Sequence, residues 1–414
     1  MNTLITPTWV ATDSAAGFEL YARLVSEFSR EWDSTWENLP DGAKIGYTTQ
    51  IRLEQRWQVT EGQQLQQQAL LNQVVPLTIN HQFQVAHGWS SADDSLVVEE
   101  VQERYTMPAG KAMAGKWDVV AGVETYKQVY FQVGAPGVPL SADQTWLDAC
   151  AKLVNVSVPD EDLVAIIDVK THSKLLGANI GAFNPQSQIS EYFRTGQFNA
   201  GALGVSAWKK DPHMPTHTTG TFTSSTPLVS GALQTGSTLV TSGWGTYSFK
   251  AGDTFYILGV NAIDPITYVD TGDPQAFVLQ TDVAGAGTAI LPISPAIIPA
   301  NVTPMSSLAT VTTSPANNAT ISFVGSTGTV NATMAAQTSK QSLLFDPGAF
   351  AFVMADLPVK LAGAVAGRFN SKIDKVSFRY VDQYSIITDQ LPRRMDSIGG
   401  VAVILPYFAL RAWS

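Results

Sequence analysis

The stretch YSFKAGDTFYILGVNAIDPIT, from Tyr247 to Thr267, contains two runs of β-forming residues around a turn. Between the runs lies Ala251-Gly252-Asp253, a tripeptide with the composition of a turn. The stretch has only three charged residues, which are Lys250, Asp253 and Asp264. We therefore predict two short strands joined by a tight turn, in a part of the chain that carries little charge.

The same texture continues on both sides of this stretch. Between Thr218 and Ser339 there are six charged residues, with no arginine and no glutamate. Thr, Ser, Gly, Val and Ala dominate the window, and short β runs alternate with turn residues. Such spacing is typical of a β-barrel or sandwich. We predict that residues 220–340 form an all-β barrel-like domain, inserted into a chain that is otherwise mixed α and β.

Two segments before this window alternate between apolar and polar residues. They cover residues 50–60 and 75–85, and residues 63–68 between them are rich in glutamine. Period-two alternation predicts half-buried strands, so we expect a long two-stranded hairpin with a polar tip. An isolated hairpin is marginally stable in water. Its apolar face must therefore lie on something else, such as a neighbouring subunit. That face carries the following side chains: Ile51, Leu53, Trp57, Val59, Val75, Leu77, Ile79, Phe83 and Val85.

The remaining segments predict helices and further strands. Pro108 suits the first turn of a helix, and the apolar stripe that follows predicts a long helix through Tyr130. Residues 141–210 alternate helical and strand patterns, including a short helix at 187–196. The run FDPGAFAFVMADLPV (345–359) looks helical, whereas 376–387 and 399–413 look like strands.

Composition limits the classes of function. Charged residues make up 14% of the 414 residues, against about 25% in typical soluble domains. Either much of the surface is hidden in an assembly, or it is neutral and polar. The net charge of −10 disfavours sequence-independent nucleic-acid binding, which needs Lys and Arg. Cys150 is the only cysteine, so no internal disulfide framework is expected. We see no secretory signal and no apolar run long enough to span a membrane.

No catalytic constellation survives inspection of the motifs. His213 and His217 have the spacing H-x-x-x-H, but nearby prolines oppose a helix and no glutamate accompanies them. The G-x-G at Gly285 lacks the third glycine and the helix of a dinucleotide site. Cys150 reads as a buried structural thiol. We therefore predict no catalytic residues, no cofactor and no metal site, and we expect that the protein is not an enzyme.

Several phrases, in their order along the chain, resemble the major capsid (coat) proteins of tailed bacteriophages. The resemblance is to the short-tailed phage branch of the Hong Kong 97-type fold that carries an inserted β-domain. It covers nearly the whole chain from Gly42, and the closing phrase from Asp389 to Trp413 carries most of it. The phrases are PLTINHQFQV (76–85), EEVQERYTMPAGKAMA (99–114), GAFNPQ (181–186), AFAFVMADLPV (349–359) and FRYVDQYSIITDQLPRRMDSIGG (378–400).

This resemblance implies an α+β fold with axial and peripheral domains, a long spine helix, an extended β-hairpin loop and an N-terminal arm. The implied domains run in chain order: N-terminal arm 1–41, extended loop 42–90, spine helix and peripheral domain 91–140, first part of the axial domain 141–219, inserted all-β domain 220–340, and return segments of the axial and peripheral domains 341–414.

The resemblance also implies a shell subunit. Hexamers and pentamers of the chain would form an icosahedral shell, with a scaffolding protein and a portal as partners. The shell would enclose double-stranded DNA without specific binding and would assemble in the host cytoplasm. As assembly contacts we predict these residues: Ile51, Leu53, Arg56, Trp57, Leu77, Phe83, Arg393 and Arg394. A shell protein of a cellular nanocompartment and, less favoured, an α/β enzyme with a β accessory domain are the alternatives.

Overall fold

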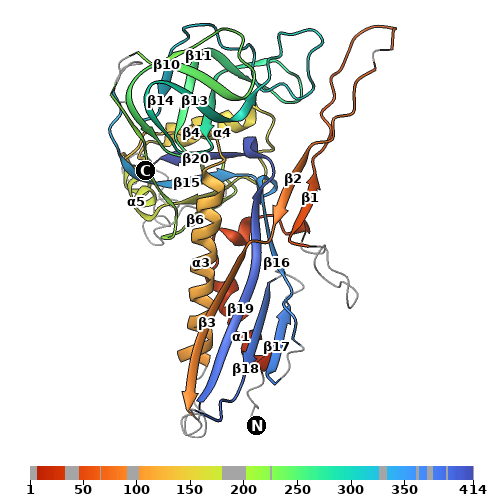
Figure 1. Ribbon diagram of the computed structural model, residues 1–414, viewed down its shortest axis with the longest axis vertical. Helices are drawn as coiled ribbons and strands as arrows, with labels where there is room; N and C mark the ends of the chain where they lie inside the picture. Colours follow the sequence, from red (N-terminus) through yellow and green to blue (C-terminus); the bar gives the residue numbers. More distant parts are fainter. Residues whose placement is uncertain are drawn as a thin grey trace. The chain divides into compact units, whose positions relative to one another are not determined.

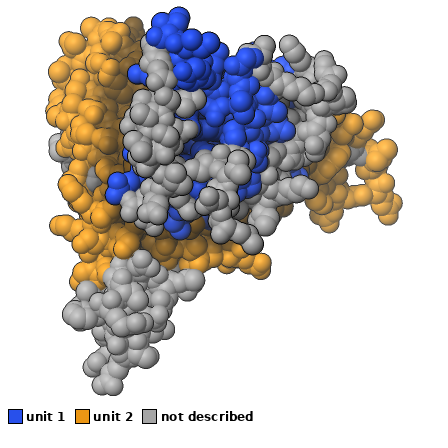
Figure 2. All heavy atoms as spheres, turned by 90° about the horizontal axis from the view of Figure 1, so that it is seen from below, with its two compact units in different colours: residues 1–51, 74–122, 350–404 blue, residues 52–73, 123–349, 405–414 orange. Residues whose placement is uncertain are grey.

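A computed structural model describes ten segments of the chain: residues 7–32, 46–65, 67–90, 102–179, 202–223, 226–325, 333–359, 363–370, 376–387 and 390–413. The chain divides into two compact units, which Figure 2 colours separately. The first unit contains residues 1–51, 74–122 and 350–404, and the second contains 52–73, 123–349 and 405–414. No helix in the described segments is both long and apolar enough to cross a membrane.

The first unit is built around one long strand, β19 (Gln390–Val403). One edge of β19 pairs with β3 (His81–Ser90), and the ladder runs from Ser90 opposite Gln390 to His81 opposite Gly399. The strand β19 also pairs with β16 and with β18, and β18 pairs in turn with β17, which gives the order β16-β19-β18-β17. The strands of that part are β16 (Phe350–Ala355), β18 (Ser377–Asp382) and β17 (Val365–Asn370).

Two helices cover this sheet, as Figure 1 shows. The helix α3 (Met107–Tyr126) places the fully buried Trp117 against the sheet, 4.7 Å from the Phe83 ring and 5.1 Å from the Phe352 ring. The indole nitrogen of Trp117 donates to Ser397 Oγ at 3.0 Å. The helix α1 (Pro7–Tyr21) packs Phe18 edge-on against Phe378. The predicted start of a long helix at Pro108 is confirmed, although α3 ends at Tyr126, before the predicted Tyr130, and follows directly on a π-helical turn (Gln102–Thr106).

The predicted hairpin over 50–85 is only partly correct. Its base exists, because β1 (Thr48–Arg52) pairs with β2 (Val74–Thr78) in a two-stranded sheet. The second predicted arm, however, does not continue the pair, since β3 joins β19. Residues 53–73 contain no strand among those that the structure describes. The alternating pattern found half-buried segments but could not identify their partners, because β19 lies about 300 residues further along the chain.

The second unit contains a mixed sheet with helices beside it. The sheet order is β4-β20-β15-β5-β6, with β7 paired to β15. These strands are β4 (Phe131–Val133), β20 (Ala409–Trp413), β15 (Thr338–Phe345), β5 (Val164–Ile167), β6 (Ala207–Lys210) and β7 (Thr216–Thr218). The helix α4 (Asp143–Asn155) buries Trp146, Cys150 and Leu153. With α5 (Val169–Asn179), it gives the α/β alternation that the sequence predicts for 141–210.

The low-charge window forms an all-β body in the same unit, from Thr221 to Phe323. Its sheet order is β14-β11-β12-β13-β10-β8, with β9 paired to β10. The strands are β8 (Thr221–Phe222), β9 (Leu228–Val229), β10 (Gly236–Phe249), β11 (Thr254–Ile263), β12 (Asp270–Leu279), β13 (Val283–Ile297) and β14 (Ile321–Phe323). Bonds from Val229 N to Ala319 O and from Ile321 N to Pro227 O link the two ends of the sheet into a barrel. The strand–turn–strand predicted over Tyr247–Thr267 is confirmed by the end of β10, the turn at 250–253 and β11, but the strands are long, with 14 and 10 residues, and they do not pair with each other.

The core of the all-β body is aromatic. Phe249 stacks on Phe323 with ring centroids 4.8 Å apart, and Trp244 lies edge-on to Phe249 at the same separation. Both phenylalanines and Trp244 are almost fully buried. Because the members of this cluster pack against one another, the body has a hydrophobic core of its own.

One predicted helix is wrong, and another lies outside the described residues. The run 345–359 is a strand end, a short 3-10 turn (Pro347–Ala349) and β16, in which the first five of six residues are buried. A short continuous apolar run fits a buried strand as well as a buried helix, so periodicity could not separate them. The helix predicted at 187–196 lies outside the described residues.

Candidate assembly surfaces

We use "the arm" for residues 52–73, which leave and return at the β1–β2 base. Figure 1 draws it as an open loop beyond the two strand arrows. One backbone bond crosses near its start, from Leu53 N to Gln73 O at 3.0 Å. Further out, glutamine side chains form hydrogen bonds with the backbone of the opposite half of the arm. The arm has no apolar core, because its large apolar side chains face solvent.

These exposed apolar side chains are the main surface feature of the arm. Trp57 is 56% exposed, Val59 95%, Leu65 94% and Leu70 72%. Single exposed apolar residues are ordinary on protein surfaces. Four on one thin loop that lacks a core are unusual, and such groups mark surfaces that meet another molecule.

Arg56 fixes the base of the arm within the second unit. Its guanidinium lies over the Tyr407 ring, 5.0 Å from the centroid, and Nη1 reaches Ala309 O at 3.5 Å. Arg56 is one of the residues predicted from the sequence to contact another subunit. In the folded chain, its side chain already has partners of its own.

The other residues predicted as assembly contacts fall into three groups. Ile51 and Leu77 are buried in the first unit, and Phe83 packs on Trp117. Arg394 forms an ion pair with the buried Asp396, while Arg393 lies opposite Asp382 in the β18–β19 ladder. Leu53 is half-buried and Trp57 is exposed. The structure therefore separates Trp57 from Phe83, which the sequence had placed on one face, because the two belong to different elements.

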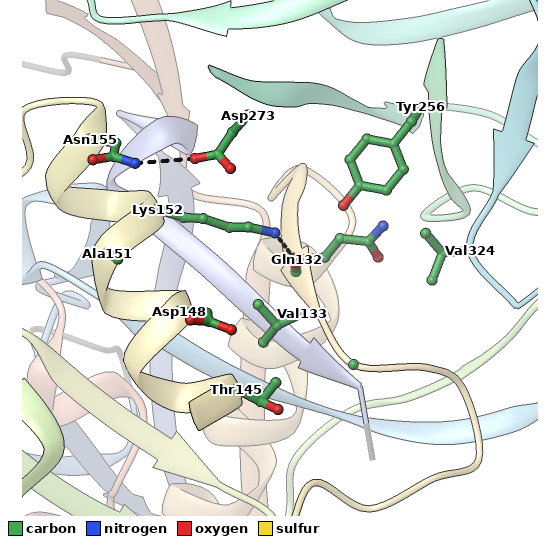
Figure 3. A pocket seen from close by; sticks show the side chains of 11 residues that line it. Gln132, Val133, Thr145, Asp148, Ala151, Lys152, Asn155, Tyr256, Asp273 and Val324 are labelled. Carbon is green, nitrogen blue, oxygen red and sulfur yellow. Dashed lines mark hydrogen bonds between the residues drawn. The ribbon is translucent and has the colours of Figure 1, made fainter. Parts of the chain in front are cut away.

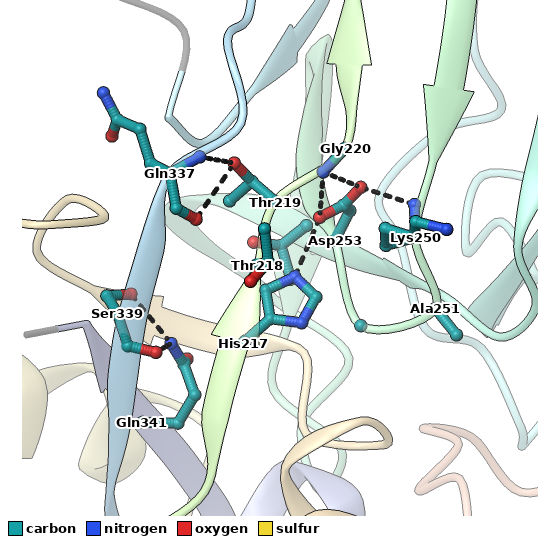
Figure 4. Close-up of polar contacts among 12 residues, drawn as sticks. His217, Thr218, Thr219, Gly220, Lys250, Ala251, Asp253, Gln337, Ser339 and Gln341 are labelled. Carbon is teal, nitrogen blue, oxygen red and sulfur yellow. Dashed lines mark hydrogen bonds and ion pairs between the residues drawn. The ribbon is translucent and has the colours of Figure 1, made fainter.

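A buried polar cluster joins the all-β body to the rest of the second unit (Figure 4). Its centre is the Asp253 carboxylate, which is 2% exposed and lies in the turn between β10 and β11. It accepts from Lys250 N at 2.8 Å, from Gly220 N at 3.0 Å and from His217 Nε2 at 2.9 Å. With the proton on Nε2, the imidazole can accept at Nδ1 from the Tyr126 hydroxyl, 3.2 Å away.

The chain enters and leaves the all-β body through paired strands beside this cluster. Ser339 of β15 lies opposite His217 of β7 in the ladder. Just beyond, Thr219 and Gln337 bind each other through backbone and hydroxyl groups. Arg411 donates to the Gly252 carbonyl in the turn, and complete burial lowers the pKa of its guanidinium to about 10. Buried charged groups, Asp253 and Arg411, therefore lie where the all-β body connects to the rest of the second unit. In the sequence, His217 stands out only through its H-x-x-x-H spacing with His213.

A cleft of about 500 Å³ lies in the second unit (Figure 3). One wall is α4, where Lys152 Nζ lies 3.5 Å from the Gln132 carbonyl and Asn155 donates to Asp273 at 3.2 Å. Tyr256 and Asp273 stand on the opposite wall. The lining residues that the structure describes include no histidine, serine or cysteine. Burial raises the pKa of the Cys150 thiol to about 11, which keeps it protonated at neutral pH.

Comparison with known proteins identifies the family. The model of the family described as "P22 coat protein - gene protein 5" matches residues 134–359. No curated protein sequence matches the chain. Among solved structures, "Mycobacterium phage Che8" is similar with a TM-score of 0.46 and 11% identity, over 94% of this chain and 90% of that one. The "CUS-3 coat protein I-domain" is 27% identical with a TM-score of 0.20, over 24% of this chain and 96% of that one.

The family match agrees with the resemblance found in the sequence and with the mixed α+β fold. It covers more than half of the 414 residues and includes the whole all-β body. The chain therefore belongs to the P22 coat protein family and is a major capsid protein of a tailed bacteriophage, a structural subunit of the multi-copy icosahedral shell of the virion.

Proposed function

We propose that the arm (residues 52–73) holds neighbouring subunits of the shell together, with Trp57 as its apolar anchor. The observation that supports this most directly is the exposure of Trp57, Val59, Leu65 and Leu70 on a loop without a core. In a shell of many copies, the surface that these side chains meet is most simply another copy of the chain. Burying a large aromatic side chain at an interface contributes about 2 kcal/mol or more.

The division of the chain follows the same reasoning. The sequence predicted an extended loop over 42–90. Because β3 belongs to the first unit, we now restrict the proposed extended loop to the arm. We assign α3 to the spine of the peripheral domain and the mixed sheet of the second unit to the axial domain. The all-β body is the inserted domain, with the proposed boundaries 220–340. The N-terminal arm 1–41 includes α1, which packs on the sheet of the first unit.

The partners and the setting follow from the role of a shell subunit. We propose assembly in the host cytoplasm with a scaffolding protein and a portal, around double-stranded DNA that the shell encloses without specific contacts. The net charge of −10 supports weak contact with DNA, because like charges repel. We also propose that the subunit has no enzymatic activity, since its role is structural.

The experiment that tests the role of the arm is Trp57→Asp in the full chain. Because the side chain is 56% exposed, the variant should fold with a melting temperature within about 2 °C of the wild type. It should nevertheless form no closed shells in the presence of scaffolding protein, as judged by electron microscopy and light scattering.

Gln63→Asp is the matched control, because it adds the same charge to the same arm at an exposed polar position. It should assemble close to normally. Normal particles from Trp57→Asp would refute the proposed anchor. Failure of both variants would show that the arm tolerates no charge and would assign the interface to the whole arm instead of Trp57.

A further inference from the structure

The glutamines of the arm are not equivalent. Gln55, Gln58 and Gln68 are half-buried, whereas Gln63, Gln64 and Gln67 are exposed. The three half-buried residues take part in hydrogen bonds that cross the arm. The exposed three make no hydrogen bond with any described residue. A glutamine-rich sequence therefore contains two kinds of glutamine, which composition alone does not distinguish.

The side chain of Gln68 pairs with the backbone of Gln58 from across the arm. Its Oε1 accepts from Gln58 N at 3.0 Å, and its Nε2 donates to Gln58 O. Both backbone polar groups of Gln58 are thereby satisfied by one side-chain amide. An amide side chain carries the same donor and acceptor as a peptide group, so Gln68 imitates a paired residue of an antiparallel ladder.

Gln55 makes a second crossing nearer the base of the arm. Its Oε1 accepts from Leu71 N at 2.9 Å, while its Nε2 donates to Arg56 O at 2.9 Å. Arg56 is itself fixed by Tyr407 and Ala309. The two crossings follow one another from the base of the arm outward. They connect the two halves of the arm at two points.

These amides take the place of a missing backbone ladder. Beyond Arg52, the described residues of the arm form no strand, and a free two-stranded ribbon of this length is only marginally stable in water. Without the crossings, the arm would sample many shapes, and docking would require the loss of that freedom. A segment that already has its bound shape binds more tightly, because less ordering is needed on docking.

We propose that Gln55 and Gln68 form a glutamine clasp that holds the arm in its docking shape before it meets a second copy of the chain. The clasp rests on the proposed role of the arm in joining subunits. Gln55 and Gln68 are positioning residues: they act on Trp57 and its neighbours by fixing the backbone that presents them. The exposed glutamines play no part in the clasp.

The first test measures the clasp itself by amide hydrogen exchange in the unassembled full-length subunit. The amides of Gln58 and Leu71 should exchange at least tenfold more slowly in the wild type than those of Gln63 and Gln64. Gln68→Ala should remove the protection at Gln58, and Gln55→Ala should remove it at Leu71. Equal, fast exchange at all four amides in the wild type would overturn the clasp.

The second test measures its consequence for assembly. The loss of one or two crossing hydrogen bonds lowers the population of the docking shape, and the concentration needed for assembly should rise about threefold to tenfold. Gln68→Ala and Gln55→Ala should both show this rise while the melting temperature of the subunit stays unchanged. Gln63→Ala and Gln67→Ala, which remove equal volume from the same arm, should assemble as the wild type does.

Gln68→Glu gives a graded variant. The carboxylate can still accept from Gln58 N but cannot donate to Gln58 O, so its effect should fall between those of the wild type and Gln68→Ala. Gln67→Glu controls for the added charge. If Gln68→Ala loses protection at Gln58 yet assembles normally, the clasp is a local feature without a role in docking, and the proposal is wrong.

The outcomes also separate the clasp from the function on which it rests. If Trp57→Asp blocks shells and Gln68→Ala does not, the arm docks without needing the clasp. If Trp57→Asp assembles normally, the proposed anchor fails, and the exchange rates at Gln58 and Leu71 still decide whether the clasp exists.

Discussion

The all-β body and the arm belong to the same unit, yet they are held together in different ways. The body encloses a cluster of aromatic and aliphatic side chains, and its backbone groups pair in long ladders. The arm points its large apolar side chains to solvent and crosses its two halves with glutamine amides. The body therefore buries its apolar side chains in a core of its own, whereas the arm leaves them exposed for a partner.

The comparison also shows where each region depends on the rest of the molecule. The body meets the mixed sheet through the buried Asp253 cluster, whose partners His217 and Arg411 lie outside its own strands. The arm is fixed at its base by Arg56. A region with its own core should survive separation from the chain, whereas a region without one should not.

The largest expected effect comes from that separation. Residues 220–340 expressed alone should give a β-type circular dichroism spectrum and a cooperative thermal transition, because the aromatic core is complete within them. A synthetic peptide of residues 52–73 should show neither feature. A disordered 220–340 fragment, or an ordered arm peptide, would remove the distinction between the two regions.

A smaller effect is expected from Asp253→Asn in the full chain. The amide keeps an acceptor but loses the charge that strengthens three hydrogen bonds, so unfolding in urea should become easier by about 2 kcal/mol. Because the fragment 220–340 lacks His217, the same substitution should cost less there. An equal loss in both would show that His217 contributes nothing to holding the body.

The smallest effect is expected at the neighbouring Lys250. Its side chain forms an ion pair with Asp282 at 2.9 Å, with the two groups 49% and 60% exposed. Exposed pairs of this kind contribute about 0.2–1 kcal/mol, so Lys250→Ala should change the free energy of unfolding by about 0.5 kcal/mol or less. The backbone N–H that Lys250 donates to Asp253 remains in the variant. If Lys250→Ala lowered the free energy of unfolding as much as Asp253→Asn does, the exposed ion pair, and not the buried carboxylate, would be what stabilises the turn.

The sequence by itself determined the properties that depend on neighbours along the chain. Six charges in the window from Thr218 to Ser339, with β runs between turn residues, predicted the all-β body, because strands and turns joined by short connections need only local patterns. Pro108 located the start of α3, since proline suits the first turn of a helix. The closing phrase gave the family, and the family match agrees with it.

Only the tertiary structure decided the features that depend on distant partners. Nothing near Phe83 in the sequence shows that its strand joins β19 or that its ring meets Trp117. The run 350–355 looked helical because a strand buried on both faces has no periodicity to reveal it. His217, Asp253 and Arg411 are far apart in sequence and meet only when the body docks on the mixed sheet. Gln68 and Gln63 are the same residue type five positions apart, and only the position of the opposite half of the arm gives one of them a backbone to bind.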